Sequence, residues 1–180
     1  MMKRIAKFEK VSLEQFLQGC QREDAESIYE GIEPPRRATS GSAGYDFFAP
    51  FDIELAPGET AKIPTGIRVK IAEGWLLSLY PRSGLGFKFR LQLDNTVGII
   101  DSDYYYSDNE GHIFAKITND SRENKTLHIA AGTGFMQGIF TEYGITEDDS
   151  ADGIRNGGFG STTENYVTCS KIKNRQRSSF

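Results

Sequence analysis

Short runs of apolar and β-branched residues, broken by turn residues, recur along most of the chain. The runs lie at residues 60–63, 66–71, 75–80, 113–117 and 126–129, and a less regular one lies at 4–11. Residues of these types favour β-strands. Turn residues such as glycine and proline separate the runs, at positions 34–35, 40–42, 56–58, 72–74 and 109–111. Many short strands with frequent turns predict an all-β fold of the sandwich, jelly-roll or barrel class.

A different pattern occurs near the N-terminus. Ser12 and Gln15 have the spacing of a capping box, in which each side chain satisfies a backbone amide at the start of a helix. Gly19 lies where such a helix would stop. The sequence therefore predicts one short helix at about residues 12–18 and no other.

The length of the chain, 180 residues, is typical of one domain. We expect a single β-domain at residues 1–152. Residues 141–152 contain five acidic side chains and little apolar material, which indicates a connector. A glycine-rich C-terminal arm with a basic tail is expected at 153–180.

Charge and composition narrow the class of protein. The net charge is −4, although the last ten residues contribute four positive charges and no acid, so residues 1–170 carry −8. An acidic body disfavours a nucleic-acid partner, which requires a basic face. The apolar runs are too short to span a membrane, and no secretory signal precedes them. Cys20 and Cys169 form no metal or disulfide motif, so we expect free thiols and a cytoplasmic protein.

The usual catalytic motifs are missing from the sequence. It contains no Gly-x-x-x-x-Gly-Lys-[Ser/Thr], His-Glu-x-x-His or Gly-x-Ser-x-Gly. Residues 132–138 begin like a dinucleotide-binding loop, but the third glycine comes one position too late. His112 and His128, the two histidines, are interpreted as surface or strand residues rather than as part of a metal cluster or a Ser-His pair.

Glycine is abundant, with 19 residues, and it allows both tight turns and close approach of a ligand to the backbone. At residues 81–86 the guanidinium of Arg82 and the hydroxyl of Ser83 are combined with bare amides, which suits phosphate oxygens. A hairpin turn with an exposed arginine is the alternative for this segment. Residues 155–162 combine an arginine, three glycines and two hydroxyls in a similar way.

Two carboxylates follow the apolar run at 97–100. Asp101 and Asp103 are two positions apart, so on a strand both point to one face. One of them could activate a water as a general base. The alternative is an acidic strand end that only solvates its charges, and the three tyrosines at 104–106 are more typical of packing than of ligand binding.

Taken in order, these clusters resemble the five motifs of the trimeric dUTPase (dUTP diphosphatase) family, across about residues 31–164. The motifs lie at residues 43–46, 81–86, 95–104, 132–137 and 157–162. The resemblance implies a jelly-roll subunit and a homotrimer whose three active sites each draw residues from all three chains. The implied reaction is hydrolysis of dUTP to dUMP and pyrophosphate, which keeps uracil out of DNA and supplies dUMP for thymidylate synthesis.

The resemblance also implies roles for individual residues. Asp101 orients and deprotonates the water that attacks the α-phosphorus. Arg82, Ser83 and Gln137 contact the phosphate chain, where charge develops in the transition state. Tyr104 packs beneath the deoxyribose and leaves no room for a 2′-hydroxyl.

The base and the metal have implied sites as well. Asn95 and nearby backbone groups match the edge of uracil, whereas cytosine presents the wrong donors and acceptors there. Mg²⁺ binds the triphosphate largely through water and phosphate oxygens, and Asp46 supports its waters. The remaining substrate-binding positions that the resemblance implies are Gly84, Gly98, Ile100 and Gly160.

The C-terminal arm is implied to close over a neighbour's site. Phe159 then stacks on the base, and Arg155, Ser161 and Thr162 hold the γ-phosphate. Two positions depart from the family pattern, because Gly134 stands where an arginine is common and Arg155 is displaced by one residue from the usual spacing. The longer segment at 105–112 and the added helix are similar to dUTPases from Gram-positive bacteria and their phages.

Two other functions remain open at this point. The related dCTP deaminases share the jelly roll and part of the motif set, so a deaminase or a bifunctional enzyme is one alternative. The other is a regulatory binding protein in which the nucleotide is a signal and residues 9–30 and 104–112 contact a protein partner. No membrane and no nucleic-acid partner is expected.

Overall fold

A computed structural model describes residues 3–157 of the chain, and β-strands dominate them. The strands are β1 Ala6–Lys10, β2 Tyr45–Phe48, β3 Ile53–Leu55, β4 Thr60–Pro64, β5 Ile67–Ile71, β6 Trp75–Pro81, β7 Leu91–Leu93, β8 Gly98–Ile100, β9 Phe114–Asn119, β10 Leu127–Ile129 and β11 Gly134–Glu142. The helices are α1 Leu13–Gly19, α2 Ala25–Gly31, α3 Ser83–Phe89 and the 3₁₀-helix η1 Ser102–Tyr106. The expectation of an all-β fold is confirmed only in its coarser form, because the fold is mostly β with a few short helices.

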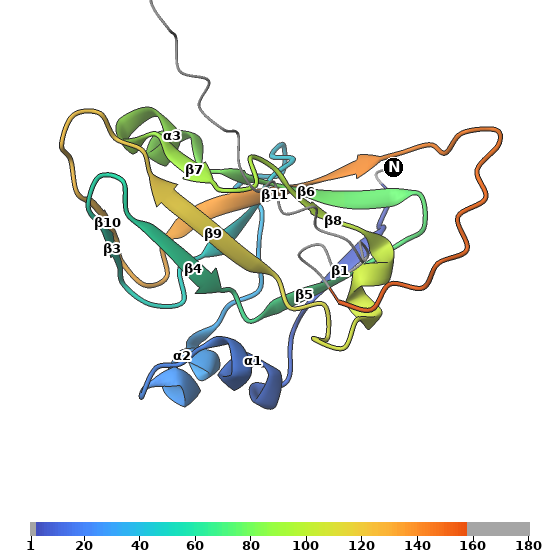
Figure 1. The fold of residues 1–180 in the computed structure, drawn as a ribbon, viewed down its shortest axis with the longest axis horizontal. Coiled ribbons are helices and arrows are strands. Elements are labelled where there is room, and N and C mark those ends of the chain that lie inside the picture. The colour runs from blue at the N-terminus through green and yellow to red at the C-terminus, as the bar shows by residue number, and fades with distance from the viewer. Residues whose placement is uncertain (1–2, 158–180) are drawn as a thin grey trace, which may run out of the picture.

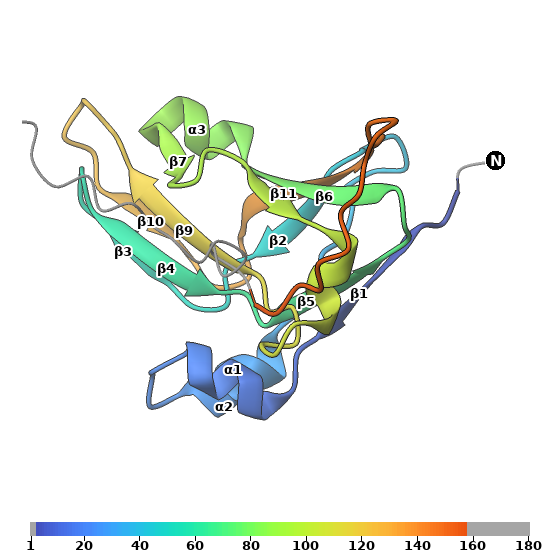
Figure 2. The same ribbon diagram turned by 45° about the vertical axis from the view of Figure 1, so that its right-hand side comes forward.

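The strands pair antiparallel in four small sheets. One sheet has the order β2-β11-β6-β8 and another the order β4-β9-β7, while β1 pairs with β5 and β3 with β10. Figures 1 and 2 show α1 and α2 side by side at one end of the molecule and α3 at the other. Within residues 3–157 the ladders remain separate sheets and form no closed barrel.

Alternation along the strands places one face of each sheet in a shared core. In β5, for example, Ile67, Val69 and Ile71 are buried, whereas Arg68 and Lys70 point the other way. Burial of such side chains stabilises the fold by about 1.5–3 kcal/mol each. The residues at 3–157 include no helix of the length and hydrophobicity that crossing a lipid bilayer requires.

The expectation of a single helix is wrong, because α2, α3 and η1 are also present. Each α-helix has seven residues, which is too short to be stable without packing against the rest of the protein. α2 packs on α1 through the rings of Tyr29 and Phe16, whose centroids are 5.6 Å apart. α3 contains Gly84 and Gly86, which are poor helix formers, so its sequence resembles a turn.

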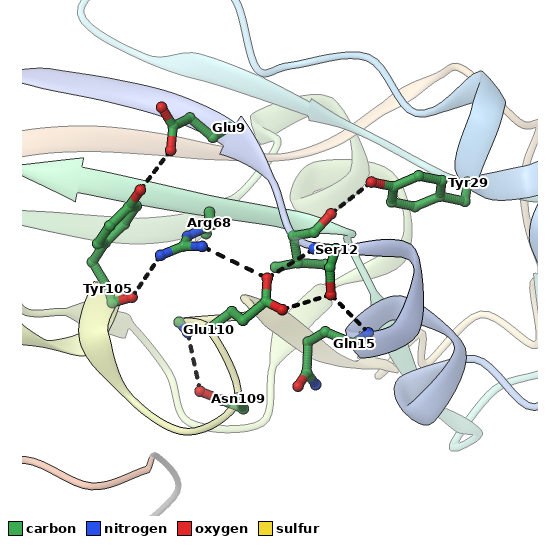
Figure 3. A network of polar contacts seen from close by, with 10 residues as sticks. Glu9, Ser12, Gln15, Tyr29, Arg68, Tyr105, Asn109 and Glu110 are labelled. Atoms are coloured by element: carbon green, nitrogen blue, oxygen red, sulfur yellow. Dashed lines mark hydrogen bonds and ion pairs between the residues drawn. The ribbon is translucent and has the colours of Figure 1, made fainter.

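The start of α1 agrees with the capping box only in part. The Ser12 hydroxyl accepts a hydrogen bond from the Gln15 amide at 3.1 Å, as predicted. The amide of Ser12 itself donates to a carboxylate oxygen of Glu110 at 2.8 Å, so Glu110 takes the place expected for the Gln15 side chain (Figure 3). A residue 98 positions away therefore completes the cap.

The interpretation of His112 as a surface or strand residue is wrong, because its side chain is fully buried just before β9. Its Nε2 accepts a hydrogen bond from the Gly66 amide at 3.0 Å, and its ring lies 4.1 Å from that of Phe114. Burial lowers the pKa of His112 from 6.5 to about 4. The native protein therefore holds this imidazole neutral.

This burial predicts an acid-sensitive fold. Below pH 6.5 the unfolded chain binds a proton at His112 that the folded protein does not bind until about pH 4, so stability falls across that window. We expect a loss of about 3 kcal/mol from this group by pH 4. Urea unfolding at pH 7 and pH 4.5 measures the loss of stability between the two pH values. We expect this loss to be smaller in His112→Gln than in wild type. In His128→Gln, which changes an exposed histidine, it should equal that of wild type. An unchanged pH dependence in His112→Gln would contradict the assignment.

Candidate functional site

Most of the predicted site residues that the structure describes gather in two clusters at opposite ends of β6, while Asn95 and Gly98 line a cavity between β7 and β8. The last residue of β6, Pro81, leads directly to Arg82. Ile100 of β8 lies opposite Leu77, near the other end of β6, and is followed by Asp101. Because β8 pairs with β6 in this register, Asp101 and Arg82 lie near opposite ends of β6.

The first cluster is centred on Arg82. Its amide donates to the Phe135 carbonyl at 3.1 Å, which fixes the start of α3 against β11. Its guanidinium forms an ion pair with Asp46 of β2, which lies opposite Gln137 of β11. The first, second and fourth predicted motifs therefore meet at one place.

Two glycines lie close to the ends of long side chains in this cluster. A Cβ at Gly44 would lie 2.6 Å from Oε1 of Gln137. A Cβ at Gly134 would lie 3.0 Å from Nη1 of Arg82, so the position that often carries an arginine in the family faces an arginine here. Arg82 supplies the positive charge beside Asp46 that Gly134 does not.

Ser83 and Gly84 lie in the first turn of α3, and both are exposed. The first amides of a helix have no partner within the helix, which leaves them able to bind a ligand. The alternative of a hairpin turn at residues 81–86 is wrong, since this segment enters a helix.

The second cluster contains the predicted catalytic carboxylate. Asp101 is the N-cap of η1, and Asp103 lies within η1, so the assumption that both lie on a strand is wrong. They nevertheless converge, because Arg155 donates to Asp101 at 2.5 Å through Nη2 and to Asp103 at 2.9 Å through Nε. Arg155 reaches this position from the segment that follows β11 and passes beside η1 in Figure 2.

Tyr104 forms an inner wall of this cluster. It is buried, its hydroxyl donates to the His112 carbonyl at 2.8 Å, and the Asn109 amide donates to that hydroxyl at 2.8 Å. Burial raises the pKa of Tyr104 above its ordinary value of 10. The hydroxyl is therefore neutral and is fixed by these two hydrogen bonds.

A cavity of about 380 Å³ lies beside the turn that connects β7 to β8, two strands that belong to different sheets. Its volume suits a small organic ligand. Asn95 and Gly98 contribute to its wall, together with apolar side chains that include Leu93, Phe114 and Met136. A Cβ at Gly98 would lie 3.1 Å from Leu79 of β6, so a side chain here would crowd the neighbouring strand.

The predicted arm residues Phe159, Gly160, Ser161 and Thr162 lie outside the described residues. Within residues 3–157, no three His, Cys, Asp or Glu side chains are grouped to hold a metal by themselves. Sequence reasoning did not find Asn109 or Glu110, because their contacts depend on how a loop folds back and leave no local signal.

Comparisons with known proteins agree on one family. A protein-family model described as dUTPase matches residues 30–163. The deoxyuridine 5′-triphosphate nucleotidohydrolase of Lactococcus lactis subsp. lactis (strain IL1403) is 42% identical over 135 residues, which are 73% of this chain and 89% of that protein. The crystal structure of dUTPase from Streptococcus mutans has a TM-score of 0.60 and 31% identity, covering 78% of this chain and 98% of that one.

A further solved structure shows the same fold. It is a mutant dUTPase from phage phi11 of S. aureus, with a TM-score of 0.60 and 21% identity, and it covers 83% of this chain and 98% of that chain. A structural Mg(II) ion is coordinated in that protein.

Proposed function

The chain belongs to the dUTPase family and hydrolyses dUTP, and from that premise we propose that Asp101 activates the attacking water while Arg82 and Gln137 hold the triphosphate. The observation that supports this proposal is that residues of the first, second and fourth motifs meet around Arg82, while the carboxylates of the third motif meet around Arg155. The cluster with Asp101 and Asp103 contains the proposed general base, and the cluster around Arg82 contains the proposed donors to phosphate.

The proposed hydrolysis is a single displacement at the α-phosphorus. Asp101 accepts a proton from a water, whose oxygen bonds to the α-phosphorus. The bond from that phosphorus to the bridging oxygen breaks, and pyrophosphate leaves with the bonding electrons while dUMP remains. In this proposal the phosphate oxygens accept hydrogen bonds as charge builds on them. The donors are the Arg82 guanidinium, the backbone amides of Ser83 and Gly84, and the side-chain amide of Gln137.

We propose a homotrimer whose sites are shared between chains. Asp101 follows Ile100, which lies opposite Leu77, so Arg82 is about six residues away along β6. At about 3.3 Å per residue this is roughly 20 Å, longer than a triphosphate. One chain therefore cannot present both groups to the same phosphate chain, but two chains of a symmetric assembly can.

Mg²⁺ fits the residues at the Arg82 cluster. Asp46 offers the hard carboxylate oxygens that Mg²⁺ prefers, and Mg²⁺ commonly binds one or two carboxylates together with waters and substrate phosphates. We propose that Asp46 holds the waters of a Mg²⁺ ion on the triphosphate. When bound, the ion neutralises part of the phosphate charge.

The remaining parts of the proposal concern the base, the arm and the fold. Asn95, with the backbone of Gly98 and Ile100, binds uracil at the turn between β7 and β8, beside the cavity. The arm at residues 153–180 closes over a neighbour's site, where Phe159 stacks on the base, and the β-domain at 1–152 is a jelly roll. For Arg155 to reach a γ-phosphate with Ser161 and Thr162, it must leave Asp101 and Asp103.

A regulatory protein partner and a cytoplasmic location also remain proposals. The first is supported by the contact between the added N-terminal helix and the tyrosine-rich loop, where Ser12 meets Glu110. A partner bound to one of these segments would therefore act on two segments that contact each other.

A panel of nucleotides tests substrate choice. With Mg²⁺ we expect pyrophosphate from dUTP and a rate about 10⁴-fold lower from dCTP, because cytosine leaves buried donors and acceptors unpaired. Turnover of dTTP and UTP is also expected to be slow, since the thymine methyl and the 2′-hydroxyl do not fit. Release of ammonia from dCTP would instead indicate a deaminase.

A further inference from the structure

The loop that follows the catalytic carboxylate is held by a polar network outside the proposed site (Figure 3). Arg68 of β5 donates through Nη2 to the Tyr105 carbonyl at 2.9 Å, and its guanidinium lies 3.7 Å from the centre of the Tyr105 ring. The Tyr105 hydroxyl donates to Glu9 of β1 at 2.6 Å. Both ends of Tyr105 are therefore fixed to the β1–β5 sheet.

Glu110 holds the other end of the same loop. Its carboxylate accepts from the Ser12 amide at 2.8 Å and from the Ser12 hydroxyl at 2.5 Å. The same carboxylate lies 3.6 Å from Nη1 of Arg68, and the two side chains are only 19% and 32% exposed. Arg68 thus contacts both η1 and Glu110, and Glu110 in turn contacts Ser12 at the start of α1.

The segment between these anchors carries Tyr104. Gly111 has a φ of +68°, and a Cβ on it would lie 2.8 Å from the Tyr104 carbonyl oxygen, so the loop closes tightly on η1. Asn109 binds the Tyr104 hydroxyl from inside this loop. A shift of residues 105–110 would consequently move the ring of Tyr104.

We propose that Arg68 and Glu110 are positioning residues that set the selectivity of the enzyme for deoxyribose over ribose. They touch no substrate and act by holding the Tyr104 ring where a 2′-hydroxyl would collide with it. This inference rests on the proposed role of Tyr104 as the wall beneath the sugar. Steric exclusion depends on small displacements, so a loosened wall admits UTP before it stops dUTP hydrolysis.

The chemistry of Arg68 explains why another cation would not serve. The planar guanidinium reaches the Tyr105 carbonyl and the Glu110 carboxylate with two different nitrogens while it stacks on the Tyr105 ring. A lysine ammonium is a point charge without this fork or this flat face. Arg68→Lys is therefore expected to behave more like Arg68→Ala than like wild type.

The test is the ratio of kcat/KM for dUTP to kcat/KM for UTP. In Arg68→Ala and in Glu110→Gln we expect this ratio to fall about tenfold, mainly through faster UTP turnover, while dUTP is still hydrolysed. Lys70→Ala is the matched control, since it removes the same charge two positions along β5 and should leave the ratio unchanged. An unchanged ratio in both Arg68→Ala and Glu110→Gln, whatever their thermal stability, would overturn the proposal.

Two further variants separate the possible failures. Tyr104→Leu should lower the ratio at least as much as Arg68→Ala. If Tyr104→Leu lowers it and the Arg68 and Glu110 variants do not, the positioning role alone is wrong. If Tyr104→Leu leaves it unchanged, the proposed sugar wall is wrong and the inference fails with it. The double variant Arg68→Ala/Glu110→Gln should lower the ratio no further than one single variant, because the two side chains act through one loop.

Discussion

Asp101→Asn is expected to lower kcat for dUTP hydrolysis by about 10³-fold while the protein still binds the nucleotide. The amide keeps the size and shape of the carboxylate but cannot accept the proton of the attacking water. Binding should persist because the proposed donors to phosphate belong to the Arg82 cluster at the other end of β6. Pre-steady-state hydrolysis and equilibrium titration with dUTP measure the two properties separately.

Asp103→Asn is the matched control for this change. Both carboxylates contact Arg155, so each substitution removes one partner of that arginine. A general role of negative charge near Arg155 would make the two variants equally slow. The account requires a much larger loss at Asp101, and full activity of Asp101→Asn would contradict it.

Arg82→Ala is expected to lower kcat/KM for dUTP by about 10²-fold or more. The guanidinium is proposed to stabilise charge on the phosphate oxygens, and its removal also leaves Asp46 without its ion-pair partner. Arg82→Lys should recover only part of the activity, because an ammonium cannot bind two oxygens with a planar fork. Steady-state kinetics with dUTP and Mg²⁺ provide the measurement.

Arg90→Ala provides the control at the other end of α3. Arg90 also pairs with an aspartate, Asp120, but both side chains are about half exposed, and such pairs contribute little. We expect its kinetics to match those of wild type. Wild-type kcat/KM in Arg82→Ala would remove Arg82 from the proposed phosphate site.

Local patterns predicted β1, β4, β5, β6, β9 and β10, because they report which face of a strand is buried, but β2, β3, β7, β8 and β11 were not among the predicted runs. In β5 the apolar Ile67, Val69 and Ile71 alternate with charged residues, and the structure buries the apolar set. The order of the motifs along the chain was equally informative, since it indicated the family that the comparisons show. The likeness to proteins from Lactococcus and Streptococcus agrees with the resemblance to the Gram-positive type.

Contacts between distant segments could not be predicted in this way. Glu110 caps α1 from 98 positions away, and Arg155 reaches Asp101 across 54 positions. Neither contact follows from a local pattern, since each depends on how loops return to the sheets. The short helices α2 and α3 were missed for the same reason, because packing rather than intrinsic propensity stabilises helices of this length.

Gly134 stands where an arginine is common in the family, and the structure shows what surrounds this position. From the sequence, a glycine at this position indicates only that a charge is absent or replaced. In the structure Arg82 lies 3.0 Å from where a Cβ of residue 134 would be, and it pairs with Asp46. A side chain at Gly134 would therefore approach the guanidinium that pairs with Asp46.

The central claim is that Asp101 and Arg82 of different chains serve one phosphate chain, and mixing inactive subunits tests it most directly. Asp101→Asn and Arg82→Ala subunits, unfolded and refolded together, should regain activity, with about one quarter of the sites combining an intact Asp101 with an intact Arg82. Each variant refolded alone should stay inactive, and wild type treated in the same way should recover fully. Mixed subunits with no more activity than the separate variants would contradict the shared site.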